Sequence, residues 1–272
     1  MSSINARPPA VAALKVLSLA IVIYAYAALA MGNSSNPASL IVLFSAVISS
    51  IAGFAFSAIS GSMLLHVVSD PVKAVQIMLV ASIALQAYSV WVLRKAIRVR
   101  ELLPYFAGGL LTVVPGAYLL LNTPTAFYLL ALGAFLTAYG TYMLICSPVR
   151  LEQNSLMGRI FVGALGGITG ATAAFPGAFV TLWCAAHKWE KQHQRAIYQP
   201  FILGMQLITL AVLTTLSPAA ALHAELLQYA VPAVLGSHLG LSVFNILNAV
   251  QFNKIVSAFL LVSGVLMLAK AL

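Results

Sequence analysis

The sequence predicts an all-α polytopic membrane protein with two inverted-topology repeats, each a broken-helix hairpin plus three transmembrane helices, and one extra N-terminal helix. Three observations predict it: an apolar composition, recurring apolar runs and an internal repeat. The chain is 62% hydrophobic and 7% charged, whereas soluble domains have about 25% charged residues. Runs of about 20 apolar residues can cross a hydrocarbon core, and the alternating strands of a membrane barrel are absent from the sequence.

Each element follows from an apolar run and from the turn residues that bound it. Residues 11–31 share features with a signal peptide, but we interpret them as a first spanning helix. Broken helices are expected at 39–69, interrupted near Ser57–Ser62, and at 158–187, interrupted near Thr169–Gly177. Intact spans are expected at 73–93, 103–121, 125–146, 196–216, 226–248 and 254–271. The corresponding units are 1–38, 39–146 and 147–272.

The internal repeat is a short motif that occurs once in each half. Glu101-Leu102-Leu103-Pro104-Tyr105 recurs as Glu225-Leu226-Leu227-Gln228-Tyr229, and eleven residues after each tyrosine stands a glycine, Gly116 or Gly240. Each half contains a hairpin and three spans. Because three is odd, the second half is inverted relative to the first, which is typical of transporters whose substrate site lies between the halves.

The distribution of basic residues supports this topology. If both broken segments return to their own side, twelve of the fourteen Lys and Arg residues share one face, and only Lys73 and Lys270 lie opposite. If each broken segment crosses once, the split is seven to seven. Under the positive-inside rule, the hairpin topology places the N-terminus of this multi-pass protein in the cytoplasm and the C-terminus outside.

Composition also restricts the partners. The net charge of +9 comes from basic residues in short connections between apolar segments, so we do not expect nucleic acid to bind. Cys146 and Cys184 have no metal or redox spacing. No metal or cofactor is expected. The expected partners are a small anionic substrate and membrane lipid, and a homodimer is left open.

The two predicted breaks are rich in small and hydroxylated residues. Aligned with an offset of 110, they match Ser57 with Gly167, Ser60 with Gly170 and Ser62 with Thr172. A helix that begins at such a break presents unpaired N–H groups and a partial positive charge to an anion. The same residues are also typical of ordinary close helix packing. The candidate substrate-binding residues at the breaks are Ser57, Ser60, Gly61, Ser62, Thr169, Gly170 and Thr172.

Polar residues inside the spans could line the same path. Gln86, Gln206 and His238 are the candidates, although hydrogen bonding between helices is the commoner role of such residues. No Asp, Glu, Lys or Arg stands in the middle of a predicted span, so the sequence contains no carboxylate proton carrier. If transport is coupled to protons, His238 is the best candidate to carry one.

These motifs resemble those of a known family. Gly163-Ala164-Leu165-Gly166-Gly167-Ile168-Thr169-Gly170, followed by Pro176-Gly177, is similar to the glycine-rich hairpin of the TauE/SafE family of sulfite exporters and toluenesulfonate permeases. Residues 51–62 resemble the first copy of that hairpin, and Lys73-Ala74 and Arg195-Ala196 resemble the start of the following helix. The resemblance covers about residues 40–270. It implies export of sulfite or related organosulfur anions by bacteria.

The sequence therefore favours a secondary transporter that exports a small sulfur-containing anion, sulfite or a short organosulfonate, by alternating access. An anion channel or an uptake permease for another small organic anion is the alternative. An intramembrane enzyme is disfavoured, because the only adjacent nucleophile and base, Ser237 and His238, point about 100° apart on one helix. A purely structural subunit is a further alternative, which absence of flux from the isolated protein would reveal.

Overall fold

The computed structural model describes residues 37–52, 56–145, 153–187, 189–216 and 224–244, with scattered residues between 254 and 269. Apart from Pro37, they belong to one compact unit, Ala38–Leu272. All regular structure in these ranges is helical, as predicted. The predicted span at 11–31 lies outside the described residues, and the span at 254–271 is described only at isolated positions, each of them helical.

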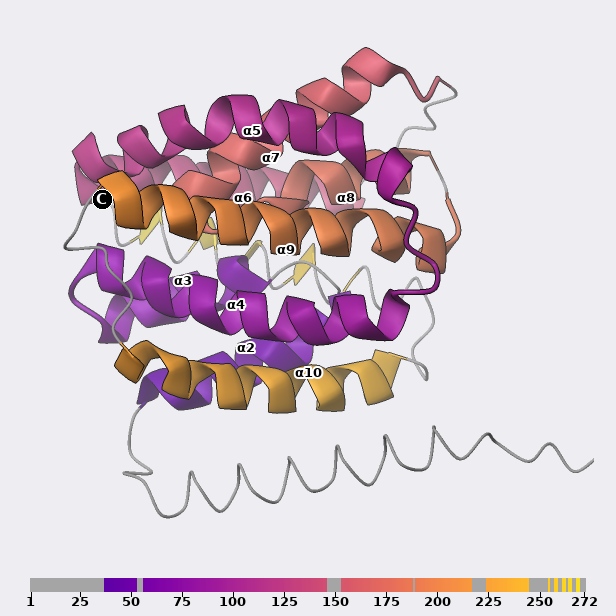
Figure 1. Cartoon of the computed structure of the whole chain (residues 1–272). Coiled ribbons are helices and arrows are strands. Elements are labelled where there is room, and N and C mark those ends of the chain that lie inside the picture. Colours follow the sequence, from indigo (N-terminus) through magenta and orange to yellow (C-terminus); the bar gives the residue numbers. More distant parts are fainter. Residues whose placement is uncertain are drawn as a thin grey trace, which may run out of the picture. The chain divides into compact units, whose positions relative to one another are not determined.

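The helices occur in the same order in both halves (Figure 1). The first half contains α2 (Pro37–Ala52), α3 (Phe56–Val67), α4 (Pro71–Leu93), α5 (Val99–Asn122) and α6 (Thr125–Ile145). The second contains α7 (Leu156–Ala173), α8 (Gly177–Ala186), α9 (Lys191–Leu216), the 3₁₀ helix η2 (Ala224–Tyr229) and α10 (Ala230–Phe244). Among the described residues, three stretches are long and apolar enough to span a membrane: Lys73–Leu93, Val99–Asn122 and Gln192–Leu216.

The first predicted interruption was misplaced. Ser57–Ser62 lies inside α3, so the chain is helical through the predicted break. Serine does not end a helix when its hydroxyl bonds to the preceding turn, and Ser60 Oγ donates to the carbonyl of Phe56 at 2.8 Å. As described, α2 and α3 have 16 and 12 residues, and residues 53–55 between them lie outside the described residues.

The second interruption lies within its predicted range but is much shorter. Thr169 is still helical, and α7 ends only at Ala173. Ala174 then takes a left-handed conformation with φ of 52°, and Pro176 precedes the first residue of α8, Gly177. Residues 53–55 lie outside the described residues, so the predicted alignment of the two breaks stays a prediction.

Glycines hold the first arm of each hairpin against a helix of the other half. An added Cβ at Gly163 of α7 would lie 2.1 Å from the carbonyl oxygen of Tyr105 in α5. At Gly240 of α10 it would lie 2.2 Å from the carbonyl oxygen of Val47 in α2, and at Gly116 it would lie 2.9 Å from Ala171 Cβ. Gly116 and Gly240, the matched glycines of the repeat, are thus close helix contacts, as small residues are between membrane helices.

These contacts determine how the helices run. Gly236 meets Leu43 and Gly240 meets Val47, so α2 and α10 are parallel. Lys73 in the first turn of α4 pairs with Glu225 in η2 at 3.9 Å, so α4 starts at the same end as η2 and α10. The connection 68–70 returns the chain from α3 to that end. Helix α2 therefore runs away from it and α3 runs back.

The second hairpin starts from the other end. Gly163 meets Tyr105 and Gly167 meets Gly109, so α7 is parallel to α5. Near the start of α9, His193 lies 3.5 Å from Glu101 in the first turn of α5. The short connection 94–98 places that end where α4 finishes. Helices α4 and α9 therefore run in opposite directions, as Figure 1 shows.

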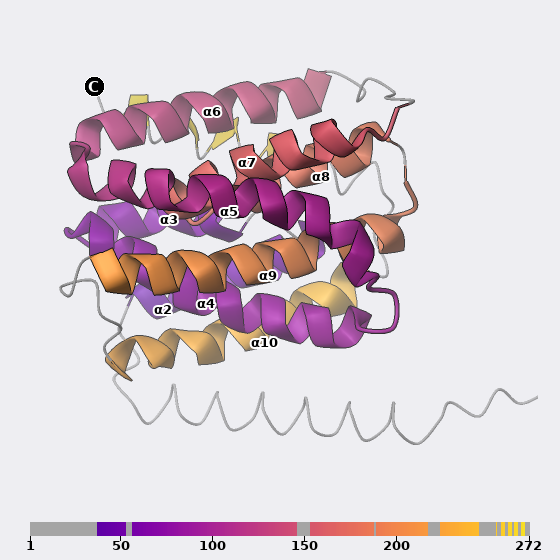
Figure 2. The same ribbon diagram turned by 45° about the horizontal axis from the view of Figure 1, so that its top comes forward.

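Helix α9 lies at the centre of the described helices. It packs against α4 on one side and α5 on the other, and α10 packs on α4. Figure 2 shows α6 at the edge beyond α5. The outward face of α5 is apolar and exposed, with Leu111 74% exposed and Leu103, Leu110 and Val114 also exposed. Such a face suits a lipid environment better than water.

Candidate functional site

The tips of the two hairpins touch each other. Ser57, in the first turn of α3, donates a hydrogen bond from Oγ to the carbonyl oxygen of Ala174, which lies in the break between α7 and α8. Ser57 is 3% exposed and Ala174 is 1% exposed. The contact therefore places the first described turn of α3 against the break between α7 and α8 at one buried point.

A side chain from α9 joins the same carbonyl. Gln206 Nε2 donates to Ser82 Oγ of α4 at 2.7 Å and lies 3.4 Å from the Ala174 oxygen. Gln206 was predicted as a lining residue, and the structure brings it to the break. Ser82 was not predicted, because a single serine in a long apolar run gives no signal distinct from helix packing.

Gln86 is the second polar residue on this side of α4. It stands four residues after Ser82, so the two share one face of the helix. Gln86 is 1% exposed, and within the described part of the chain neither Nε2 nor Oε1 has a hydrogen-bond partner. Gln206 Oε1 is also buried without a partner there. Buried amides are normally hydrogen-bonded, so these groups offer both donor and acceptor capacity that the folded chain does not use.

The start of α8 adds unused backbone donors. Its N-cap residue is Pro176, which has no side-chain hydrogen bond to the first turn. The first turn of a helix leaves N–H groups without intrahelical partners and carries a partial positive charge. Gly177 and Ala178 are buried there. A buried, uncapped N-terminus beside a helix break is suited to a negatively charged group.

The hydroxyls of Ser60, Thr169 and Thr172, which were expected to bind an anion, donate hydrogen bonds within their own helices instead. Thr169 Oγ1 donates to the carbonyl of Leu165 and Thr172 Oγ1 to that of Ile168, both at 2.9 Å. Ser60 bonds within α3 in the same way. Gly170 accommodates the ring of Pro176, whose Cβ would lie 3.0 Å from an added Cβ. Gly61 is buried in α3, and the side chain of Ser62 lies outside the described residues. Their role in binding stays a prediction.

His238, a residue of α10, packs against a different face of α4. Its Nδ1 is 3.1 Å from the hydroxyl of Tyr88, and the two rings meet edge to face. Tyr88 follows Gln86 by two residues, which is about 200° around a helix. The pair therefore lies between α4 and α10, whereas Ser82 and Gln206 join α4 to α9.

Arg195 has a structural role that the sequence did not reveal. The sequence placed it only at the start of a helix, and it is 5% exposed. Its guanidinium donates to the carbonyl oxygens of Ser50 at 3.0 Å and Ile51 at 2.8 Å. A cation at the C-terminal end of a helix stabilises the unpaired carbonyls there. Arg195 thus anchors the last described turn of α2.

Comparison with known proteins identifies the family. The sequence profile described as "Sulfite exporter TauE/SafE" matches residues 38–267, which includes all of the described helices except for the first residue of α2 and the last described positions of the chain. No curated protein and no solved structure matches the chain. Members of the matched family are membrane transporters and not enzymes. The family that the glycine-rich motif resembles is confirmed: the chain belongs to the TauE/SafE family of sulfite exporters.

Proposed function

We propose that this protein is a secondary transporter that exports a small sulfur-containing anion, sulfite or a short organosulfonate, across the bacterial inner membrane. The observation that carries the proposal is the contact between Ser57 and Ala174, which joins the first described turn of α3 to the break between α7 and α8 at a buried point. Non-helical backbone at membrane depth is tolerated where protein or a polar cavity surrounds it. The family match supports the class of substrate.

The two halves are inverted repeats in this proposal. The support is that α4 and α9, which hold the same place in each half, run in opposite directions (Figure 1). The pairing of helices is also repeated, since α4 packs on α10 as α9 packs on α5. Rocking of one half against the other would expose the central site to each face in turn, as in other inverted-repeat transporters.

The anion would be held by neutral donors. The uncapped N–H groups at Gly177 and Ala178 and the free amide of Gln86 are the available donors, and Ser57 would join them by releasing the Ala174 oxygen. Arg195 is engaged by carbonyls of α2. Binding through dipoles and amides, without a dedicated cation, would be weak and would favour release.

The exposed basic residues set the proposed orientation. Arg94, Lys95, Arg98 and Arg100 are exposed at the end where α5 begins. By the positive-inside rule, this end would face the cytoplasm, with the N-terminus on the same side and the C-terminus in the periplasm. Lys73 and Glu225 would then lie at the periplasmic end.

Flux into proteoliposomes tests the proposal. The protein should produce saturable flux of sulfite or a short organosulfonate, and Gln86→Leu should lower that flux about tenfold, the equivalent of one lost hydrogen bond to a charged group. Gln228→Leu, at an exposed glutamine of η2, is the matched control and should transport normally. Flux no greater than in protein-free liposomes, or full activity of Gln86→Leu, would reject the proposal. Flux that never saturates would indicate a channel.

A further inference from the structure

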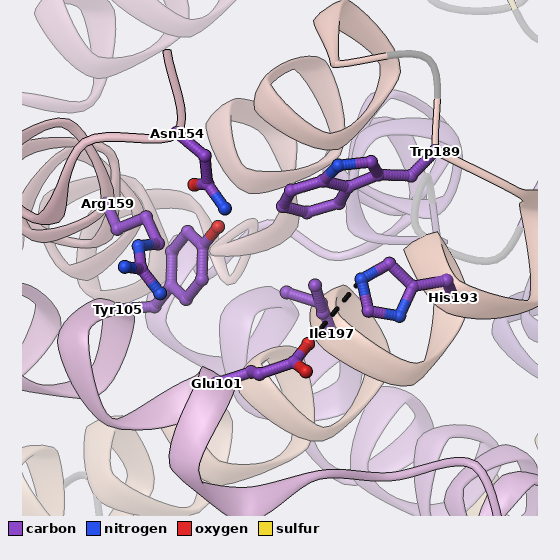
Figure 3. A pocket seen from close by; sticks show the side chains of 7 residues that line it. All are labelled: Glu101, Tyr105, Asn154, Arg159, Trp189, His193 and Ile197. Carbon is purple, nitrogen blue, oxygen red and sulfur yellow. Dashed lines mark ion pairs between the residues drawn. The ribbon is translucent and has the colours of Figure 1, made fainter.

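A separate pocket of about 270 Å³ lies at the end where α5, α7 and α9 begin (Figure 3). Its polar lining includes Tyr105, Asn154 and Arg159, and a second wall is formed by Glu101 and His193. Trp189 and Ile197 complete it. None of these residues takes part in the contact between the hairpin tips.

Two buried donors of this pocket have no acceptor among the residues that the structure describes. They are the hydroxyl of Tyr105, whose side chain is 0% exposed, and the Nε of Arg159. The indole N–H of Trp183 lies near the Tyr105 hydroxyl, but neither group reaches hydrogen-bond geometry. In Figure 3 the Tyr105 hydroxyl points toward the Asn154 amide, with the Arg159 guanidinium beside the Tyr105 ring. Buried donors of this kind are matched by a ligand that only accepts hydrogen bonds.

The negative charge in the pocket is already compensated. Glu101 lies 3.5 Å from His193 Nε2 and 3.3 Å from Arg98 Nη1. Arg159, in contrast, has no ion-pair partner among the described residues. An arginine without a carboxylate partner favours an anionic ligand, because its planar fork matches the oxygens of a carboxylate or sulfonate.

The remaining walls are apolar and aromatic. The Tyr105 and Trp189 rings border the pocket, and Ile197 is buried at 3% exposure. Trp189 is held by edge-to-face contact with His193, with 5.0 Å between the ring centroids. Such walls exclude water from an apolar group but give a bare inorganic ion nothing to contact.

We infer that this pocket is a binding site for small organic anions with a sulfonate or carboxylate head and a short apolar body. The head accepts hydrogen bonds from Arg159, Tyr105 and Asn154, and the body lies between the Tyr105 and Trp189 rings. The inference rests on the proposed function in one respect only. The proposed transport of an organosulfonate makes this pocket the first site that the substrate meets on its way to the hairpin tips.

The test is calorimetric titration of the purified full-length protein with benzenesulfonate, methanesulfonate and sulfite. To remove the central site, the same titrations are repeated in the Gln86→Leu variant. Benzenesulfonate should bind at least about tenfold more tightly than sulfite in both proteins, as expected for burial of a phenyl group. Arg159→Gln should weaken its binding about tenfold or more, and Tyr105→Phe a few-fold.

Arg100→Gln is the matched control, because it removes a positive charge from an exposed position near the same end and should leave affinity within about twofold. Equal affinity for sulfite and benzenesulfonate, or unchanged binding in both Arg159→Gln and Tyr105→Phe, would overturn the inference. If Arg159→Gln does not fold, Tyr105→Phe and Asn154→Ala decide the question. The two proposals fail separately: normal binding without flux contradicts only the transport function, and normal flux without pocket binding contradicts only this site.

Discussion

Helices α4 and α9 hold corresponding places in the two halves but use the same side chain differently. Gln86 and Gln206 each stand fifteen residues after the first residue of their helix, from 71 to 86 and from 191 to 206. Both are 1% exposed. Gln206 bonds to Ser82 and Ala174, whereas both polar atoms of Gln86 are without partners among the described residues. The comparison indicates that one glutamine holds the hairpin break in place, and it is consistent with the proposed role of the other in binding a ligand.

The beginnings of the same helices differ as well. Arg195 of α9 is buried and bonds to two carbonyls of α2. Lys73 of α4, which precedes a buried alanine just as Arg195 does, is exposed and pairs with Glu225 at 3.9 Å. Removing a buried, hydrogen-bonded cation costs more stability than removing an exposed one, because the buried acceptors lose their donor whereas water and salt screen the exposed pair. The two halves are therefore similar in backbone and different in where they use polar side chains for stability.

The largest expected effect is at Arg195. Arg195→Met should lower the free energy of unfolding by about 3 kcal/mol, because it leaves the carbonyls of Ser50 and Ile51 without their charged donor. Lys73→Met should change it by less than about 0.5 kcal/mol. Denaturation of both variants in detergent, followed by circular dichroism, measures the difference. Equal stability of the two variants would remove the distinction between the helix starts.

The glutamine pair should separate stability from transport. Gln206→Leu should cost about 1–3 kcal/mol of stability, because Ser82 and Ala174 lose a buried donor. Gln86→Leu should cost nothing or stabilise the fold, because it removes a buried amide without partners. The same denaturation experiment compares them. A similar loss in both variants would mean that Gln86 also serves the fold, and it would weaken the proposed site.

A smaller effect on stability is expected from substitution of Ala174, whose carbonyl oxygen Gln206 approaches. Ala174 has a positive φ, which is costly for a residue with a Cβ. Ala174→Gly should therefore raise stability by about 0.5 kcal/mol, since the relief of strain slightly exceeds the entropy gained by the unfolded chain. Ala171→Gly, in the last turns of α7, should instead lower stability by about 1 kcal/mol. A loss in both variants would show that the left-handed turn is not strained.

The smallest effects are expected at the ion pairs beside the helix starts. Glu225→Gln removes one ion pair, with the partially exposed Lys73, whereas Glu101→Gln removes the contacts with both Arg98 and His193. Each change should alter the free energy of unfolding by less than about 0.5 kcal/mol, and that at Glu225 should be the smaller. Thermal denaturation at low and high salt measures this, because raised salt should reduce both differences. A loss at Glu225 that exceeds the one at Glu101 would contradict the stated order.

The sequence predicted the bounds of the helices better than the positions of the breaks between them. Helix α6 at Thr125–Ile145 nearly equals the predicted span, since Asn122–Pro124 ends one helix and starts the next. The break at Ser57–Ser62 was wrong, because small hydroxylated residues are compatible with a helix and only packing shows whether the chain turns there. The Pro176-Gly177 pair was a better signal, since proline has no backbone N–H to donate and is suited to a helix start.

By itself, the sequence determined that the chain is helical and membrane-bound, that it carries a repeated motif, and that its charges gather in the connections. Length and hydrophobicity dictate these properties residue by residue, without reference to distant segments. Only the tertiary structure decided that Ser57 meets Ala174, that Arg195 is buried against α2, and that Gln206 has partners among the described residues while Gln86 has none there. These facts depend on contacts between residues far apart in the chain, and two identical glutamines acquire different roles only from what packs around them.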